Sequence, residues 1–189
     1  MAAVTATGGD VLIDNITPKH LESISAKLIE MGATIEEFDE SLRITMTKRP
    51  KKCNITTLPH PGFPTDMQPQ ITTVLSIADG TSIVAEGVWD NRFRYVEQLS
   101  IMNANIQVDG KVAVVSGVEN LKSAPVYAND LRAGAAMVIA GLIAKGTTEI
   151  ENIELIDRGY EDLVEKLTKL GADIKRVTID EPVAIQQAL

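Results

Sequence analysis

Apolar residues in this chain follow a helical spacing of three and four in some segments and the alternation of a strand in others. The two patterns succeed each other in a fixed order. Between residues 21 and 31 they recur at steps of three and four, the spacing of one buried helix face, at Leu21, Ile24, Leu28 and Met31. Thr17 stands at the position of an N-cap, Pro18 suits the first helical turn, and Gly32 suits a left-handed C-terminal cap. The segment is therefore expected to run strand, loop, helix and strand.

This order of elements occurs three times. The copies start at Gly8, Asp79 and Lys145. Their helices end in the similar tripeptides MGA, MNA and LGA, which begin at residues 31, 102 and 170 and so lie 71 and 68 residues apart. Self-similarity at such a period, the length of one supersecondary unit, indicates a repeat architecture.

The first two copies continue with a hairpin and a second helix. We predict the hairpins over 34–37 with 41–47 and over 105–108 with 111–116, and the second helices over 66–78 and 130–144. Asp109-Gly110 is a strong two-residue turn signal. The repeating unit is therefore βαββα, or βαβαββ when cut elsewhere, and the fold class is α/β.

Long loops, over 48–65 and 117–129, separate each hairpin from the second helix. Loops of this length in a compact domain are often functional. The alternative is that they only cross from one structural layer to another.

The two ends of the chain break the pattern. Residues 1–6 resemble the last turns of a helix that begins earlier, and residues 180–189 follow the third predicted strand without a hairpin partner. We therefore expect residues 1–189 to form most of a single domain of a larger protein.

Composition narrows the classes of function. The 189 residues include 18 Lys and Arg against 26 Asp and Glu, a net charge of −8, and 44% are hydrophobic. The negative charge disfavours nucleic acid as a partner, because proteins that bind it concentrate positive charge. No apolar run approaches the roughly 18 to 20 residues that span a bilayer, and the N-terminus lacks a signal peptide's features. We expect a cytoplasmic protein without a membrane partner.

Cysteine and histidine are scarce. Cys53 is the single cysteine, and His20 and His60 show no metal-ligand spacing, so we expect no internal disulfide and no metal site. The basic residues 48–52 could lower the pKa of the Cys53 thiol. Residues 54–58, however, alternate between polar and apolar like a strand, which favours a half-buried, unreactive cysteine.

Two aspartates occupy equivalent positions of the repeat, Asp66 in PGFPTDMQPQ and Asp130 in PVYANDLRAG. Each opens a predicted second helix, where the helix dipole and free N–H groups stabilise a carboxylate that has no catalytic role. The residues alone favour this capping explanation, with a catalytic pair as the alternative.

Three arginines lie at loop or helix-start positions: Arg92 in WDNRF, Arg132 in DLRAG and Arg158 in IDRGY. A guanidinium binds phosphate or carboxylate through two parallel hydrogen bonds, so converging arginines would bind an anionic substrate even in an acidic chain. Arg92 and Arg158 are repeat-equivalent, which predicts that they point to the same end of the structure. Solvated pairs such as Asp157 with Arg158 are the alternative.

Five motifs give the chain a family resemblance over nearly its whole length: GGDVLIDNITPKHLES, PHPGFPTDMQPQ, GVWDNRFRYVEQL, APVYANDLRAGAAMVIAGL and IDRGYEDLVEKLTKLGA. Their order and spacing resemble the C-terminal portion of the UDP-N-acetylglucosamine 1-carboxyvinyltransferases, which belong to the enolpyruvyl transferase family. The resemblance implies an inside-out α/β barrel domain built from βαβαββ repeats, here incomplete at the N-terminus. It also implies a second domain and a substrate cleft between the two.

The implied reaction transfers the enolpyruvyl group of phosphoenolpyruvate to the 3′-hydroxyl of UDP-N-acetylglucosamine in peptidoglycan biosynthesis. Phosphoenolpyruvate is a co-substrate, and no cofactor is implied. Without its N-terminal domain, the chain is expected to be inactive alone. The alternatives are a non-catalytic module that binds a nucleotide sugar or a protein, and the related 3-phosphoshikimate enolpyruvyl transferase.

The resemblance also implies roles for individual residues. Asp66 matches the aspartate that contacts the sugar hydroxyl as its base, and Val88 matches a hydrophobic position beside the nucleotide sugar. Arg92, Arg132 and Arg158 match arginines near phosphoenolpyruvate, and Asp130 matches an aspartate close to the reacting centre. The implied catalytic residues are Asp66, Asp130 and Arg158, and the implied substrate-binding residues are Asp66, Val88, Arg92, Arg132 and Arg158.

Overall fold

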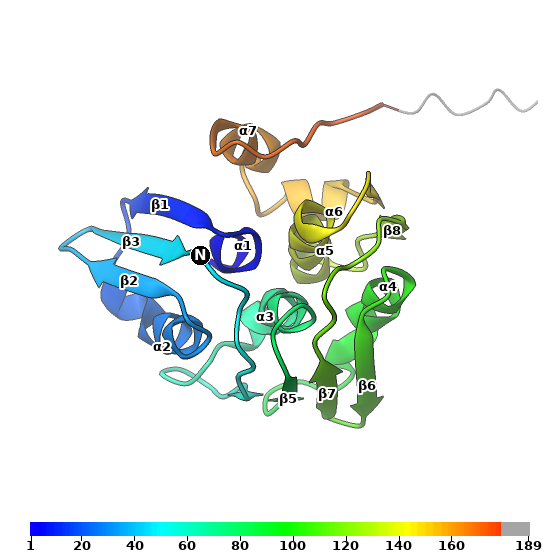
Figure 1. Cartoon of the computed structure of the whole chain (residues 1–189), viewed down its shortest axis with the longest axis horizontal. Coiled ribbons are helices and arrows are strands. Elements are labelled where there is room, and N and C mark those ends of the chain that lie inside the picture. Colours follow the sequence, from blue (N-terminus) through cyan, green and yellow to red (C-terminus); the bar gives the residue numbers. More distant parts are fainter. Residues whose placement is uncertain (179–189) are drawn as a thin grey trace, which may run out of the picture.

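Helices and strands alternate along residues 1–178, the part of the chain that the computed structural model describes (Figure 1). The strands are β1 Gly9–Asp14, β2 Thr34–Glu37, β3 Ser41–Met46, β4 Ile55–Thr56, β5 Thr81–Ala85, β6 Asn105–Asp109, β7 Val112–Ser116, β8 Pro125–Tyr127 and β9 Glu149–Glu151. The α-helices are α1 Ala2–Thr7, α2 Glu22–Glu30, α3 Gln68–Leu75, α4 Val96–Ile101, α5 Leu131–Ile143, α6 Glu154–Asp157 and α7 Leu163–Lys169. Three 3₁₀ helices, η1 Pro18–Leu21, η2 Thr65–Met67 and η3 Arg92–Tyr95, precede α2, α3 and α4. The expected α/β class is confirmed.

Three helices form the centre of the molecule. Each of α1, α3 and α5 contacts the other two, and Figure 1 shows them nearly end on, with the sheets outside them. All eight residues of α3 are buried, and α5 is apolar around most of its circumference. A helix that is hydrophobic on every side belongs in the interior, which explains why these two lie inside the sheets.

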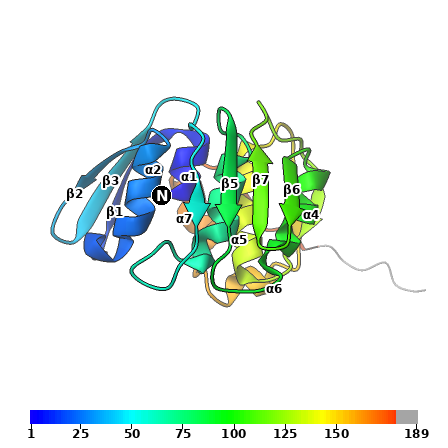
Figure 2. The ribbon, with the colours of Figure 1, turned by 90° about the horizontal axis from the view of Figure 1, so that it is seen from below.

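Two of the three sheets are built alike. In the first, of order β1-β3-β2, both pairings are antiparallel. In the second, β4-β5-β7-β6, the same antiparallel arrangement of β5, β7 and β6 carries β4 as an added parallel strand (Figure 2). The third pairs β8 with β9 in parallel. The two predicted hairpins are confirmed, and so is the repeat in its first two copies.

The first predicted amphipathic helix begins in two steps. Pro18 opens the 3₁₀ helix η1, and the α-helix starts only at Glu22. Thr17 occupies the N-cap position of η1 as predicted, but its side chain makes no capping hydrogen bond. Gly32 has a φ of +106°, which agrees with the expected left-handed cap.

The third copy of the repeat departs from the first two. Two short helices, α6 and α7, follow β9. The strand expected after α7 is not formed over 172–178, because these residues pair with no other strand in the described chain. The prediction for residues 180–189 lies outside the described residues.

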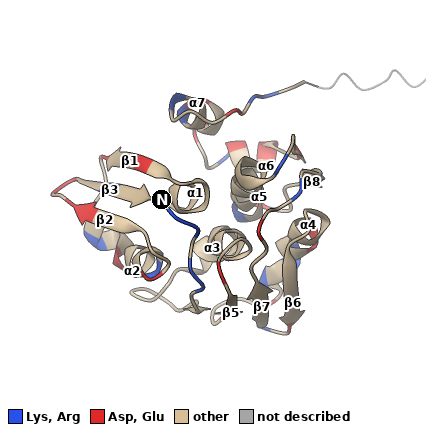
Figure 3. Cartoon of the chain, in the orientation of Figure 1, with Lys and Arg blue, Asp and Glu red and all other residues tan. Residues whose placement is uncertain are grey.

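The first long loop joins layers in its early part. Arg49 donates hydrogen bonds from Nε to Ile77 O at 2.8 Å and from Nη2 to Ala78 O and Val118 O at 3.2 and 2.9 Å. Arg49 therefore ties this basic segment, the blue stretch that leaves β3 in Figure 3, to the residues that follow α3, as the crossing alternative predicts. Within residues 1–178, every helix is too short or too polar to span a membrane.

Candidate active site

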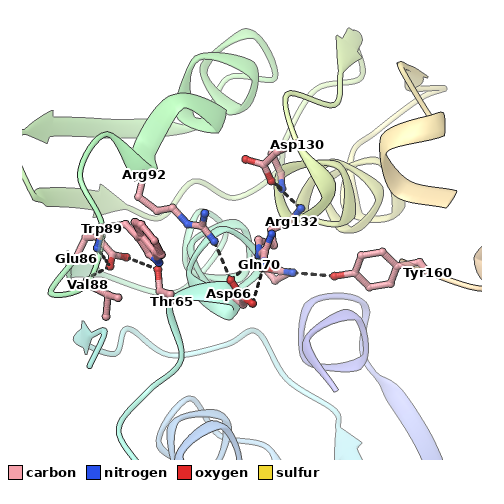
Figure 4. A network of polar contacts seen from close by, with 11 residues as sticks. Thr65, Asp66, Gln70, Glu86, Val88, Trp89, Arg92, Asp130, Arg132 and Tyr160 are labelled. Atoms are coloured by element: carbon pink, nitrogen blue, oxygen red, sulfur yellow. Dashed lines mark hydrogen bonds and ion pairs between the residues drawn. The ribbon is translucent and has the colours of Figure 1, made fainter. Parts of the chain in front are cut away.

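Three of the predicted residues meet where α3 and α5 begin (Figure 4). Asp66 lies in η2, just before α3, while Arg132 lies in the first turn of α5 and Arg92 opens η3. Arg132 donates from Nε to Asp66 Oδ1 at 2.5 Å and from Nη2 to Oδ2 at 2.8 Å. Arg92 adds a hydrogen bond from Nη2 to Asp66 Oδ1 at 3.0 Å. The carboxylate is thus held by one bidentate and one single contact.

The two arginines keep Asp66 ionised. The hydrogen bond from Arg132 is the main cause that lowers the pKa of Asp66 below its ordinary value, and the charges of Arg132 and Arg92 act in the same direction. The Asp66 side chain is nevertheless 56% exposed, against 17% for Arg92. A charged carboxylate therefore faces solvent beside two guanidinium groups.

Asp130 has a different environment, although its repeat position matches that of Asp66. It is the N-cap of α5, and its Oδ1 accepts from the backbone N–H groups of Arg132 and Ala133 at 2.7 and 2.9 Å. The capping explanation is therefore confirmed for Asp130. Capping does not explain the contacts of Asp66, because both of its carboxylate oxygens accept from arginine side chains instead of backbone N–H groups.

An open hollow of about 300 Å³ adjoins these groups, and its lining residues are Trp89, Asp90, Asn91, Arg92, Arg94 and Asp130. Most of this wall comes from the turn that leads from β5 into η3. All six lining residues belong to the second copy of the repeat, and Asp130 is the N-cap of α5. Val88, on the same turn, is 36% exposed.

Arg158 does not join the cluster. Its side chain is exposed and, within the described chain, takes part in none of the hydrogen bonds or ion pairs. The alternative, an ion pair of Asp157 with Arg158, is not formed, because Asp157 accepts from Arg176 Nη2 at 2.6 Å. Consecutive residues at a helix end point in different directions, which separates these two side chains.

The segment after Arg158 still reaches the same end of the molecule. Gln70 of α3 donates from Nε2 to the hydroxyl of Tyr160 at 3.2 Å. A Cβ on Gly159 would lie 2.9 Å from a methyl group of Leu131, so this segment packs against the first residue of α5. Tyr160 and Gly159 therefore lie near the starts of α3 and α5, whereas the predicted common direction of the Arg92 and Arg158 side chains stays a prediction.

Cys53 lies apart from this site. It is buried in the main core, its backbone N–H donates to Ser82 Oγ at 3.1 Å, and it precedes β4. Burial, with a further contribution from Glu30, raises the pKa of the Cys53 thiol to about 12. A neutral, buried thiol is a poor nucleophile, so the expectation of an unreactive cysteine is supported, although Cys53 is fully buried and not half-buried as predicted.

Sequence reasoning missed one buried acid. Glu86 directly follows β5 and is 3% exposed. Its Oε2 accepts from Thr65 Oγ1 at 3.1 Å, and its Oε1 accepts from the N–H groups of Val88 and Trp89 at 2.9 and 3.0 Å (Figure 4). The available signal was an isolated acid at the end of an apolar strand, immediately before a glycine.

Comparison with known proteins identifies the family. The family model for EPSP synthase (3-phosphoshikimate 1-carboxyvinyltransferase) matches residues 1–167. The UDP-N-acetylglucosamine 1-carboxyvinyltransferase of Desulfofundulus thermocisternus is 47% identical over 186 residues, which cover 98% of this chain and 76% of that protein. This chain belongs to the enolpyruvyl transferase family.

Other enolpyruvyl transferases extend the likeness. UDP-N-acetylglucosamine 1-carboxyvinyltransferase 2 of Clostridium acetobutylicum is 56% identical over 95% of this chain and 43% of its own length. The crystal structure of the enolpyruvyl transferase NikO from Streptomyces tendae matches with a TM-score of 0.81 and 27% identity, covering 92% of this chain and 42% of that one. EPSP synthase from Acinetobacter baumannii, at 18% identity and a TM-score of 0.58, shares the fold over 79% of this chain and 37% of its own. The chain spans less than half the length of most of the curated relatives it matches.

Proposed function

We propose that this chain supplies contacts to the acceptor sugar and to phosphoenolpyruvate in an enzyme that transfers the enolpyruvyl group of phosphoenolpyruvate to the 3′-hydroxyl of UDP-N-acetylglucosamine. The reaction would serve peptidoglycan synthesis in the cytoplasm, with phosphoenolpyruvate as co-substrate and without a cofactor. The observation that carries the proposal is the exposed Asp66 carboxylate, held between Arg92 and Arg132. The choice of acceptor is supported by relatives of that name at 47 to 56% identity.

Asp66 is proposed to act as the base for the sugar hydroxyl. In the structure described, Arg132 holds the pKa of Asp66 below its ordinary value, which makes the carboxylate a weak base. An incoming phosphate or carboxylate would compete for the same guanidinium groups. When they turn toward that anion, the pKa of Asp66 rises and the carboxylate becomes free to accept a proton.

The arginines are proposed to bind phosphoenolpyruvate. Arg92 uses only Nη2 for Asp66, and its side chain makes no other hydrogen bond within the described residues. A guanidinium with unused donors can stabilise charge that develops on the transferred group. We include Arg158 in this set by family resemblance, although its side chain lies outside the cluster in the structure.

Asp130 and Val88 complete the proposed site. Asp130 uses one carboxylate oxygen for the cap of α5, which leaves Oδ2 for a contact near the reacting centre. Val88 offers a partly exposed apolar side chain beside the nucleotide sugar. Both assignments rest on the family resemblance and agree with their position around the same hollow.

We further propose that residues 1–189 form one domain of the inside-out α/β barrel type, with helices inside and sheets outside, built from βαβαββ units. The mutual packing of α1, α3 and α5 supports this arrangement. A second domain would close over the exposed Asp66 and provide the remaining contacts to substrate. The chain alone is therefore proposed to be inactive.

Two other functions make different predictions. The family model carries the name of the 3-phosphoshikimate enzyme, so that acceptor is the first alternative. A non-catalytic module that binds a nucleotide sugar or a protein is the second. Identity to the UDP-N-acetylglucosamine enzymes is 47 to 56%, against 18% to EPSP synthase from Acinetobacter baumannii. This difference favours transfer to UDP-N-acetylglucosamine over the two alternatives.

Calorimetric titration with the two acceptors tests the choice of substrate. We expect saturable binding of UDP-N-acetylglucosamine, and binding of 3-phosphoshikimate alone would overturn the proposal. Phosphate release is then measured twice, first with the chain alone. The second measurement adds a fragment of the Clostridium acetobutylicum relative, namely the part of that relative that has no counterpart in this chain. Release only in the second case is expected. Full turnover by the chain alone contradicts the need for a second domain, and none in either case favours the non-catalytic module.

A further inference from the structure

Glu86 connects three segments that approach the proposed acceptor site. It follows β5, accepts from the hydroxyl of Thr65 and accepts from two N–H groups of the next turn. Thr65 directly precedes Asp66, and the turn carries Val88 and Trp89. One buried carboxylate therefore links the helix start that presents Asp66 with the turn that lines the neighbouring hollow.

Both carboxyl oxygens of the buried Glu86 side chain accept hydrogen bonds from neutral groups. Within residues 1–178, Glu86 forms none of the ion pairs with lysine, arginine or histidine. Burial of a carboxylate without a cationic partner is unfavourable unless its oxygens receive good donors. The three donors at 2.9 to 3.1 Å meet that requirement. One is the hydroxyl of Thr65, next to Asp66, and the other two are the N–H groups of Val88 and Trp89.

The turn is held from its other side by β4 and the residue after it. Gly87 donates its N–H to Thr57 Oγ1 at 2.9 Å. A Cβ on Gly87 would lie 2.3 Å from Thr57 O, so only glycine permits this approach of the two backbones. The turn is therefore clamped between Thr57 and the Glu86 carboxylate, while Val88 and Trp89 remain 36% and 60% exposed.

We propose that Glu86 is a positioning residue of the acceptor site, which holds the turn of Val88 and Trp89 in register with Asp66 through Thr65. The ligand in this inference rests on the proposed function, whereas the link between the three segments does not. Glu86 touches no reacting atom and acts through the groups that it orients.

The single tryptophan of the chain makes the proposal measurable without a ligand. Trp89 lies in the turn, so its fluorescence anisotropy and its quenching by acrylamide report on the order of that segment. In Glu86→Gln, the amide oxygen can still accept from both N–H groups and the amide nitrogen can donate to Thr65. In Glu86→Ala, all three contacts are lost.

We expect Glu86→Ala to lower the anisotropy of Trp89, to speed amide exchange at Val88 and Trp89, and to weaken UDP-N-acetylglucosamine binding about tenfold, the scale of one lost charged hydrogen bond. Glu86→Gln should restore most of the affinity. The matched control is Ser82→Ala, which removes the buried acceptor of the Cys53 N–H on the same strand. It should lower stability and leave Trp89 and the affinity unchanged.

A milder pair covers the case in which Glu86→Ala does not fold. Thr65→Val removes only the hydroxyl, whereas Thr65→Ser keeps it, so the first should weaken binding and the second should not. Wild-type anisotropy, exchange and affinity in Glu86→Ala, or in Thr65→Val if the former is unfolded, would overturn the proposal. If the wild-type chain binds no UDP-N-acetylglucosamine, the proposed function fails, and the Trp89 and exchange measurements still decide the role of Glu86.

Discussion

Asp66 and Asp130 occupy the same position in successive copies of the repeat, yet their carboxylates do different things. Asp130 has an extended backbone, with φ of −157° and ψ of 176°, and its carboxylate turns back onto the N–H groups of α5. Asp66 lies inside the 3₁₀ helix η2, after Pro64. Its carboxylate makes no capping hydrogen bond and accepts from two arginine side chains instead.

The difference lies in the local backbone before each helix. An extended residue at an N-cap brings its side chain within reach of free N–H groups, as at Asp130. Asp66 instead lies within the 3₁₀ helix η2, whose N-cap is Pro64, so it does not occupy an N-cap position. The capping Asp130 is expected to contribute mainly to stability, and the solvent-facing Asp66 mainly to catalysis. Substitution of Asp130 should therefore lower stability, whereas substitution of Asp66 should lower turnover.

Asp66→Asn should have the largest effect. The amide cannot accept the proton of the sugar hydroxyl, and removal of a general base lowers turnover about 10² to 10⁴-fold. Phosphate release by the chain together with its complementing part measures this loss. Stability should change by less than about 1 kcal/mol, because the ion pair is largely exposed. Turnover within a few-fold of wild type would remove Asp66 from the proposed mechanism.

Asp130→Ala should affect stability more than Asp66→Asn does. Loss of an N-cap costs about 1 kcal/mol, within a range of roughly 0.5 to 2. Urea unfolding measures the change in the free energy of unfolding. Asp130→Ser, which can still cap, should recover most of it. If Asp130→Ser also loses turnover, the carboxylate acts near the reacting centre as proposed, and if it does not, Asp130 only caps α5.

Arg132→Lys tests whether the bidentate contact controls Asp66. Lysine keeps the charge but cannot form two parallel hydrogen bonds, so the pKa of Asp66 should move up toward its ordinary value. Titration of the Asp66 carboxyl carbon by NMR measures the shift. Arg132→Met, which also removes the charge, should raise the pKa further, and an unchanged pKa in both variants would exclude Arg132 as the cause.

The smallest expected effect is on the pH dependence of stability. The pKa of Asp66 is lower in the folded state than in the unfolded chain, so ionised Asp66 stabilises the fold above about pH 4, its unfolded value. That contribution is lost as the pH falls through the folded-state pKa. Urea unfolding of wild type and Asp66→Asn should therefore give a small difference at neutral pH that shrinks below about pH 4. A constant difference down to pH 2 would contradict the pairing.

The repeat and its main elements followed from the spacing of apolar residues. The hairpin around Asp109-Gly110 and the helix after Asp130 were predictable because turn chemistry, period and capping agree locally. The 3₁₀ start at Pro18 and the absence of a strand over 172–178 were not. Those outcomes depend on packing and on strand partners, which local patterns do not encode.

The site was predictable in its residue types but only partly in its contacts. Asp66, Arg92 and Arg132 were named from the sequence, whereas their mutual pairing joins positions 26 and 66 residues apart. Arg158 carried the same local signals as Arg92 and yet lies outside the cluster. Glu86 was missed because its role depends on burial against Thr65, which only the folded chain reveals.

The meeting of the starts of α3 and α5 has a consequence for how such a site can change. Two copies of one unit bring corresponding positions to a single point, but each position is encoded separately. A substitution in one copy therefore leaves its counterpart unchanged, so Asp130 can keep stabilising the start of α5 while the position of Asp66 changes its role. A duplicated unit in this arrangement provides a second residue at the same place, which can acquire a chemical function without loss of the helix cap.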